Sequence, residues 1–227
     1  SWGHDLESKS NLGFLVNKIL KGCPDLNRLK LSSMDVIGFD EQLLEIITSE
    51  KRILPHLHLS LQAGDNMILK RMKRRHLRED AINLCSGIRK KRKDMAFGAD
   101  LITGFPTETD EMFLNTMKIV DECNLDWLHV FPFSPRPGTP AAKMPQNKKE
   151  VAKERARILR SKGEKIKKLH LESLVGKEVE VFVEKNNSGH TNQFAPVKLE
   201  DDFLPGSSVI AKIVKSDSNF VYGKSIN

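Results

Sequence analysis

The sequence of 227 residues predicts an α/β fold in which parallel strands form part of a barrel, followed by a small all-β module. Three observations predict this arrangement. Strand-like and helix-like patterns alternate over residues 11–133, one strand is polar along an entire face, and the residues beyond 176 show only strand-like patterns. Because each crossover is long enough to hold a helix, the alternating strands are expected to run parallel with the helices outside.

The amino-terminal part of the chain is expected to hold two helices with a strand between them. Residues 11–21 place apolar side chains at helical spacing, and Gly22 ends that helix. Residues 28–33 alternate polar and apolar side chains, as a strand does. Asp40 is the expected N-cap of the second helix, because its carboxylate can accept hydrogen bonds from the first free N–H groups.

The polar face belongs to residues 56–62, which alternate between leucines and polar residues. A central strand of an open sheet with helices on both sides reads instead as a nearly continuous apolar run. In a barrel whose lumen holds a polar ligand, both faces of this strand find a suitable environment. The leucines pack against helices, and Ser60 and Gln62 face the lumen. Asp100 falls on a polar face near the end of a later strand. We therefore favour a partial (β/α) barrel, with an open doubly wound sheet as the alternative.

The remaining elements of the first region follow in order. A long basic helix is expected from residue 65 to about residue 93, with His76 as a solvated residue on it. Strands are expected at 95–103 and 126–133, and helices at 109–123 and 147–172.

The all-β module is predicted from short strand patterns separated by turns, which suggest a small barrel or open sheet. Because so short a segment has a thin core, it is expected to dock on its neighbour. The strand patterns lie at 178–184, 193–199, 208–214 and 220–223. The expected domains are 1–146 for the partial barrel, 147–173 for a basic connecting helix and 174–227 for the β module.

Composition excludes several classes of protein. Charged residues make up 30% and hydrophobic residues 39%, which is ordinary for a globular chain and unlike a disordered one. No apolar run approaches the roughly 20 residues of a membrane helix, so no membrane partner is expected. The 3 cysteines are far apart and form no Cys-x-x-Cys pair, so we expect no metal site in this chain. Unpaired thiols fit a cytoplasmic protein.

Positive charge gathers in two blocks of a chain whose net charge is +7. Eleven Lys and Arg against two acidic residues lie between Lys70 and Lys93, and ten against three lie between Lys148 and Lys168. This concentration favours a polyanionic partner, and nucleic acid is the first candidate. Two solvated helix faces are the alternative explanation.

Two segments that follow strands carry candidate chemistry. Gly104 lets the backbone approach a ligand closely in the turn 102–109, at the strand ends where parallel folds place ligands. Arg136 lies at the centre of the proline-rich loop 131–140 and can hold a phosphate or a carboxylate. On the basic helix, Arg74 is the candidate for an anionic ligand group. A turn without a ligand and a rigid surface loop are the alternatives.

Four short sequence motifs occur in order along the chain: His58-Leu-Ser-Leu-Gln62, Met72-Lys-Arg74, Gly104-Phe-Pro-Thr-Glu108 and Ser134-Pro-Arg-Pro-Gly-Thr-Pro140. In this combination the sequence resembles the radical S-adenosylmethionine (SAM) methylthiotransferases, which install a methylthio group on tRNA adenosine next to the anticodon. Residues 174–227 resemble their TRAM domain, a small OB-like RNA-binding module. The sequences of residues 60–65 and 98–104 most resemble the MtaB type, which acts on threonylcarbamoyl-adenosine. The MiaB type, for isopentenyl-adenosine, and the RimO type, for a ribosomal protein, come next.

The resemblance implies a radical SAM (β/α)6 partial TIM barrel that uses S-adenosylmethionine and 4Fe–4S clusters, with the tRNA anticodon stem-loop as partner. Within it, Ser60 and Gln62 would face the ribose, and Arg74 the methionine carboxylate. The implied cofactor-binding residues are Ser60, Gln62, Arg74, Asp100, Gly104, Val130 and Phe131. The implied RNA-binding residues are Arg136, Lys153, Arg157, Lys165 and Lys168.

The sequence departs from the family at the cluster ligands. The Cys-x-x-x-Cys-x-x-Cys loop and the amino-terminal domain with its second cluster are both missing, and Ser1-Trp-Gly-His-Asp5 resembles the stretch after the second barrel strand. The chain is therefore expected to be the carboxyl-terminal half of an enzyme whose other half is a partner. Alone, it is expected to be inactive, to bind no iron and to be poorly soluble, because a sheet edge is uncovered. A non-catalytic RNA-binding protein and a parallel-barrel lyase are the alternatives.

Overall fold

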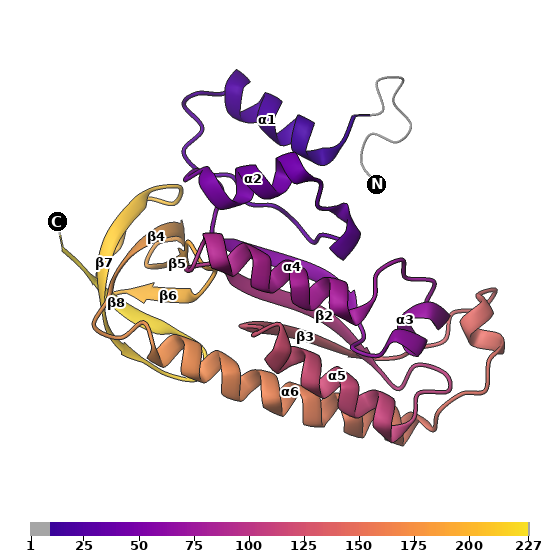
Figure 1. Ribbon diagram of the computed structural model, residues 1–227. Coiled ribbons are helices and arrows are strands. Elements are labelled where there is room, and N and C mark those ends of the chain that lie inside the picture. Colours follow the sequence, from indigo (N-terminus) through magenta and orange to yellow (C-terminus); the bar gives the residue numbers. More distant parts are fainter. Residues whose placement is uncertain (1–9, 227) are drawn as a thin grey trace. The chain divides into compact units, whose positions relative to one another are not determined.

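A computed structural model describes residues 10–226 (Figure 1). The chain forms two compact units, one ending at Arg160 and the other beginning at Ser161. Their boundary falls inside helix α6 (Lys149–Glu172), the basic helix that was expected to connect the two domains. The resemblance at Ser1–Asp5 concerns residues outside the described part of the chain.

The first unit is built on a 3-stranded parallel sheet with the order β1-β2-β3. Its strands are β1 (His56–Gln62), β2 (Ala96–Thr103) and β3 (Trp127–Pro132). All lie where the sequence predicted them. The α/β class and the parallel strand direction are therefore confirmed.

This sheet has one apolar face and one polar face. The leucines of β1 are fully buried. On the same side of β2, the Phe97 ring lies 4.6 Å from the guanidinium carbon of Arg89 on α4 (Arg78–Lys91), so a helix covers this side. Ser60 and Gln62, on the other side of β1, are only half-buried. The leucine face therefore meets the helices, as the alternation predicted, and the polar face is open from His58 onward, whereas His56 at its start is buried.

The two amino-terminal helices form as expected. Asn11 caps α1 (Leu12–Gly22) by accepting the Phe14 N–H at 2.9 Å. Asp40 caps α2 (Glu41–Ser49), and its carboxylate accepts the Leu43 N–H at 2.9 Å.

The expected strand at 28–33 is wrong. The chain pairs there at two isolated parallel bridges, Leu29 with Ile53 and Met34 with Leu59. A short 3-10 turn, Val36–Gly38, follows. Because the paired residues are five apart and those between them have no ladder partner, this segment runs beside β1 without becoming a regular strand.

The expected long basic helix is two helices, α3 (Asn66–Arg71) and α4. Lys73 adopts a φ of +57°, in the left-handed region, and the Arg74 N–H donates to the Leu69 carbonyl at 2.9 Å. This is the hydrogen-bond pattern that ends a helix. The prediction of one continuous helix is therefore wrong.

His76 lies in the turn between α3 and α4 and is 1% exposed, so it is not the solvated helix histidine that the sequence suggested. Its Nδ1 lies 3.4 Å from Asp35 Oδ1. Burial lowers the pKa of His76, against the opposing effect of the Asp35 carboxylate. The error follows from the previous one, because a continuous helix would have left this side chain in water.

The remaining helices of the chain form near their expected positions. Thr109 caps α5 (Asp110–Glu122), a 3-10 turn (Pro140–Lys143) follows the proline-rich loop, and α6 begins at Lys149. No helix in the described part of the chain combines the length and apolar character that crossing a membrane requires.

The second unit contains a closed barrel with the strand order β4-β5-β6-β8-β7. The barrel is closed by pairing of β4 with β7, and valine, alanine and isoleucine side chains fill its interior. The predicted small β module is confirmed, although β5 was not predicted as a strand of its own. The strands are β4 (Glu178–Lys185), β5 (Ser188–Thr191), β6 (Pro196–Leu199), β7 (Ser208–Ser216) and β8 (Val221–Ser225).

Candidate functional site

The uncovered face of the sheet carries polar and aromatic side chains from all of its strands. Residues two apart along a strand share a face, so each strand contributes alternate positions. The side chains on this face are His58, Ser60 and Gln62 from β1, Asp100 and Ile102 from β2, and His129 and Phe131 from β3. Four of the predicted cofactor residues therefore lie together.

The carboxyl end of β1 borders a cavity of about 280 Å³. Gln62 and Arg74 both line it, and Gln62 has a φ of +70°, which is uncommon for a residue other than glycine. Arg74 Nη1 lies 3.6 Å from Asp35 Oδ2. Ser60 Oγ is hydrogen-bonded to Ser33 Oγ at 2.9 Å. The structure thus brings Gln62 and Arg74 to one cavity, as a site for a polar ligand with a carboxylate requires.

His58, Asp100 and His129 form a cluster on the same face. Asp100 Oδ1 lies 3.0 Å from His58 Nε2 and 3.4 Å from His129 Nδ1. Asp100 and His129 are direct register partners, and His58 pairs with Gly98. A histidine on each side of Asp100 favours a positioning role for this carboxylate over direct cofactor contact. Sequence reasoning missed His129, although its alternation with Phe131 along the strand was a signal for it.

Among the described residues, this cluster is the group of His, Cys, Asp and Glu side chains whose ligand atoms are close enough to share a metal ion. These atoms all lie within 4.8 Å of one another. The cysteines lie elsewhere: Cys23 is exposed, and Cys85 and Cys123 are buried free thiols. An iron–sulfur cluster needs several thiolates around one centre. The described residues therefore do not fit such a cluster, and its ligands would have to come from outside this chain.

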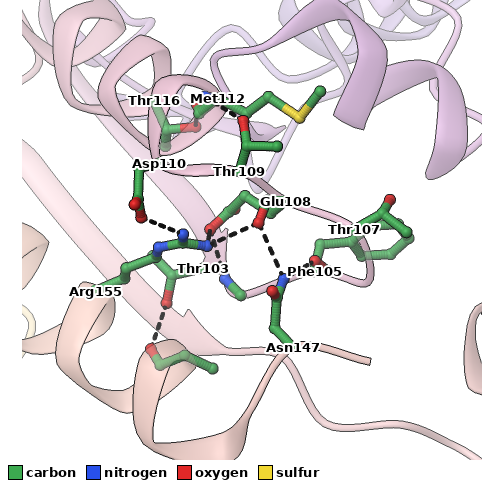
Figure 2. A network of polar contacts seen from close by, with 12 residues as sticks. Thr103, Phe105, Thr107, Glu108, Thr109, Asp110, Met112, Thr116, Asn147 and Arg155 are labelled. Carbon is green, nitrogen blue, oxygen red and sulfur yellow. Dashed lines mark hydrogen bonds and ion pairs between the residues drawn. The ribbon is translucent and has the colours of Figure 1, made fainter. Parts of the chain in front are cut away.

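Figure 2 shows the network that holds the turn after β2. The Gly104 N–H donates to Glu108 Oε1 at 2.9 Å, and Arg155 of α6 donates to the same oxygen at 2.7 Å. Arg155 also donates to Asp110 Oδ1 at 2.6 Å. Burial raises the pKa of Glu108, while the Gly104 N–H and the Arg155 charge oppose that rise. This buried ion pair ties the turn to the first part of α6.

Gly104 has a packing role in this turn. Its φ is +70°, and a Cβ there would lie 2.2 Å from Ala152 Cβ. Thr103, immediately before it, donates from Oγ1 to the Ala152 carbonyl at 3.0 Å. The absence of a side chain at Gly104 thus lets α6 approach, and contact between Gly104 and a ligand stays a prediction.

β3 presents its two predicted cofactor residues on opposite faces. Val130 is buried, and its carbonyl accepts a hydrogen bond from Arg160 Nη2 at 2.7 Å. Phe131 is 51% exposed on the uncovered face and lines a cavity of about 450 Å³ together with Arg136. The Phe131 ring can therefore contact a ligand on this face, and the Val130 side chain does not share it.

The basic residues predicted to contact RNA on α6 are exposed. They are Lys153, Arg157, Lys165 and Lys168. Arg157 pairs with Glu154 of the same helix at 2.7 Å, which is an exposed ion pair of small energetic value. Lys168 also lies 3.8 Å from Glu172, a second exposed pair of the same kind, so both side chains can exchange these partners for a polyanion.

The second unit adds cation–aromatic pairs that sequence reasoning missed. Lys198 Nζ lies 4.5 Å from the Phe220 ring centroid, and Lys215 Nζ lies 4.7 Å from that of Tyr222. Lysines beside aromatic rings are a feature of surfaces that bind single-stranded nucleic acid. Lys215 and Tyr222 lie on neighbouring strands, and Phe220, which immediately precedes β8, meets Lys198 of β6, so only the order of strands in the barrel could have revealed these pairs.

Comparisons with known proteins show what this chain is similar to. The sequence profile of the Radical SAM superfamily matches residues 15–120. The threonylcarbamoyladenosine tRNA methylthiotransferase MtaB of Rickettsia prowazekii is 44% identical over 221 residues, which are 97% of this chain and 52% of that protein. The MtaB of Aquifex aeolicus is 35% identical over 90% of this chain and 49% of its own length.

Two further similarities extend the comparison. The tRNA-2-methylthio-N(6)-dimethylallyladenosine synthase of Ehrlichia chaffeensis is 39% identical over 63% of this chain and 32% of its own length. Among solved structures, the radical SAM enzyme coproporphyrinogen III oxidase (HemN) from Escherichia coli shares the fold with a TM-score of 0.57 and 16% identity, covering 97% of this chain and 58% of that one.

Fold and comparisons together define the class of protein: the chain carries a radical SAM domain. Within that class it is a homologue of the MtaB and MiaB methylthiotransferases. The chain spans about half the length of the curated relatives it matches.

Proposed function

We propose that this chain is the carboxyl-terminal half of a tRNA methylthiotransferase that converts threonylcarbamoyl-adenosine next to the anticodon to its 2-methylthio derivative. The observation that carries the proposal is 44% identity to the Rickettsia prowazekii MtaB across 97% of the chain. The uncovered polar face supports it, because a nucleotide cofactor needs convergent hydrogen-bonding groups. The alternative substrate is isopentenyl-adenosine, since relatives named for dimethylallyl-adenosine are up to 39% identical.

Residues at the carboxyl ends of the strands would hold S-adenosylmethionine. Ser60 and Gln62 would hydrogen-bond the ribose, and the exposed Phe131 ring would lie against adenine. Arg74 would bind the methionine carboxylate by exchanging its contact with Asp35, 3.6 Å away, for the ligand. When it is bound together with an iron–sulfur cluster, this cofactor supplies the radical and the methyl group of the reaction.

A second half of the enzyme would complete the site. The described residues provide no thiolate set for a cluster, and the relatives are about twice as long as this chain. The missing half would supply the cluster ligands and the strands that close the polar face from water.

The tRNA partner would contact the basic residues of α6 and Arg136 of the proline-rich loop. These guanidinium and ammonium groups are exposed, and phosphate contacts of this kind give binding that weakens steeply with salt. The cation–aromatic pairs of the second unit add places where unpaired bases can stack.

Mass spectrometry of tRNA nucleosides tests the proposal. In a strain that lacks the gene encoding this chain, 2-methylthio-threonylcarbamoyl-adenosine should disappear while its unmodified precursor accumulates, and the restored gene should reverse both changes. Loss of the methylthio-isopentenyl nucleoside instead would establish the alternative substrate.

A non-catalytic RNA-binding protein is the second candidate, favoured by the missing cluster ligands. An unchanged nucleoside profile in the deletion strain, with tRNA still bound by the purified chain, would support this candidate and contradict the enzymatic one.

A further inference from the structure

Three side chains that can bind a metal ion meet on the uncovered face, and each comes from a different strand of the sheet. They are His58 of β1, Asp100 of β2 and His129 of β3, and their donor atoms all lie within 4.8 Å of one another. Neither histidine takes part in the proposed cofactor contacts. The cluster therefore calls for a ligand of its own.

The separations within the cluster fit three ligands of one ion. Imidazole nitrogens and carboxylate oxygens bind zinc at about 2.0–2.2 Å, which places the ligand atoms of a tetrahedral site about 3.3–3.6 Å apart. Asp100 Oδ1 lies 3.0 Å from His58 Nε2 and 3.4 Å from His129 Nδ1, close to these values. The two histidine rings have centroids 4.7 Å apart. Because the His129 side chain is 63% exposed, its ring can turn toward a shared ion without repacking the core.

The sheet holds two of the three ligands at fixed positions. Asp100 and His129 are direct register partners, and His58 pairs with Gly98, two residues before Asp100 on β2. A Cβ at Gly98 would lie 2.6 Å from His58 Nδ1, so the missing side chain leaves room for the His58 ring. The side chains of His58 and Asp100 are 14% and 25% exposed. A metal site needs ligands that are held in this way by rigid elements.

We propose that His58, Asp100 and His129 bind one Zn²⁺ ion through two imidazole nitrogens and one carboxylate oxygen. Both groups are zinc ligands, and a zinc ion with three protein ligands keeps a fourth position for water or for a ligand from outside the chain. The expectation of no metal site rested on the spacing of cysteines along the sequence, whereas these donors come from three strands. The ion is distinct from any iron–sulfur cluster, and the inference does not rest on the proposed function.

A hydrogen-bonded triad without a metal ion is the alternative explanation of the cluster. In a triad, His58 Nε2 donates its proton to Asp100 Oδ1, and a bound ion would take the place of that proton. The substitution Asp100→Asn separates the two explanations. It keeps an oxygen that can accept the hydrogen bond from His58, but it removes the charged oxygen that zinc prefers.

Metal titrations of the complete chain test the proposal. Co²⁺ is the probe, because its visible absorption reports its ligands, and competition with Zn²⁺ gives the affinity for zinc. The chain carries no histidine tag, is fused to a soluble carrier that binds no metal, and contains Cys23→Ser to remove its exposed thiol. The variants are His129→Ala, Asp100→Asn and the matched control His190→Ala. His190 Nδ1 also faces a carboxylate, Glu184 Oε1 at 2.9 Å, but it belongs to no group of three donors among the described residues.

We expect the chain to bind one Co²⁺ ion, which one Zn²⁺ ion displaces. Loss of even an outer partner of a metal ligand costs about 10–100-fold in affinity, so loss of a ligand should weaken binding by at least about 100-fold. His129→Ala and Asp100→Asn should show this loss, and His190→Ala should not. Because His129 is exposed, His129→Ala should leave the far-ultraviolet circular dichroism spectrum unchanged.

Three results would overturn the inference. The first is the absence of stoichiometric Co²⁺ or Zn²⁺ binding by a chain whose circular dichroism spectrum is that of an α/β protein. The second is equal affinity in His129→Ala or Asp100→Asn, which would leave the cluster as a hydrogen-bonded triad. The third is an equal loss in His190→Ala, which would place the ion elsewhere. The proposed function would stand in each case, since the titrations contain neither S-adenosylmethionine nor tRNA.

Discussion

Replacing Gly104 by alanine tests whether the turn after β2 depends on its contact with α6. The new Cβ would lie 2.2 Å from Ala152 Cβ and 2.6 Å from Ala152 Cα, at a φ of +70°. A left-handed backbone costs a residue with a side chain about 1–2 kcal/mol, and overpacking adds about 1–3 kcal/mol. We therefore expect the free energy of unfolding of the first unit to fall by about 2–5 kcal/mol.

Gly138 supplies a matched control, because its φ is +84° and a Cβ there would meet nothing within 4 Å. Gly138→Ala should lose only the conformational part, about 1–2 kcal/mol. Urea unfolding followed by tryptophan fluorescence measures both variants in the first unit, since both tryptophans precede residue 160. If Gly104→Ala proves no more destabilising than Gly138→Ala, the close approach of α6 is refuted.

Three further predictions concern ion pairs, pH and RNA. Arg155→Met should destabilise the first unit by about 3–5 kcal/mol, because it removes the ion-pair partner of the buried Glu108 carboxylate. Arg157→Met, at an exposed ion pair, should change the free energy of unfolding by less than about 1 kcal/mol. Equal effects of the two variants in urea unfolding would contradict this prediction. Burial lowers the pKa of His56 from 6.5 to about 3, so below pH 6.5 the unfolded state binds a proton that the folded state does not. As the pH is lowered from 6.5 toward about 3, this residue should therefore reduce the free energy of unfolding by about 1.4 kcal/mol per pH unit. If His56→Gln leaves the pH dependence of the free energy of unfolding unchanged, this effect is excluded. The double variant Lys165→Gln, Lys168→Gln should reduce the slope of log tRNA affinity against log salt concentration by about 1.4–1.8. An unaltered slope would show that these lysines do not contact tRNA phosphates.

The parallel strands were predictable from the sequence because their alternation reflects burial on one face. The same signal failed at 28–33, where the side chains alternate but the backbone pairs only at Leu29 and Met34. Alternation reports which side chains face the core; it does not report whether a neighbouring strand lies close enough along the whole segment for a ladder. That information belongs to the tertiary structure.

The break in the basic helix was hidden for a different reason. Lys73 takes a left-handed conformation although lysine has no preference for it, so nothing in the local sequence marks the position. The burial of His76 follows from that single residue.

The cluster around Asp100 was predictable only in part. The alternating pattern placed His58 and Asp100 on polar faces, but their contact joins residues 42 apart in the sequence and depends on the register of two strands. His129 enters through a third strand. Periodicity within one strand cannot supply the relative shift between strands, so His129 was missed.

Under the proposed function, the first turns of α6 would lie between two ligands. One side of the helix, through Ala152 and Arg155, supports the turn beside the proposed cofactor. Another side exposes Lys153 and Arg157, where we propose that tRNA backbone docks. Because these residues belong to one continuous helix, a shift of the helix caused by bound tRNA would also shift the residues that contact the turn at Gly104.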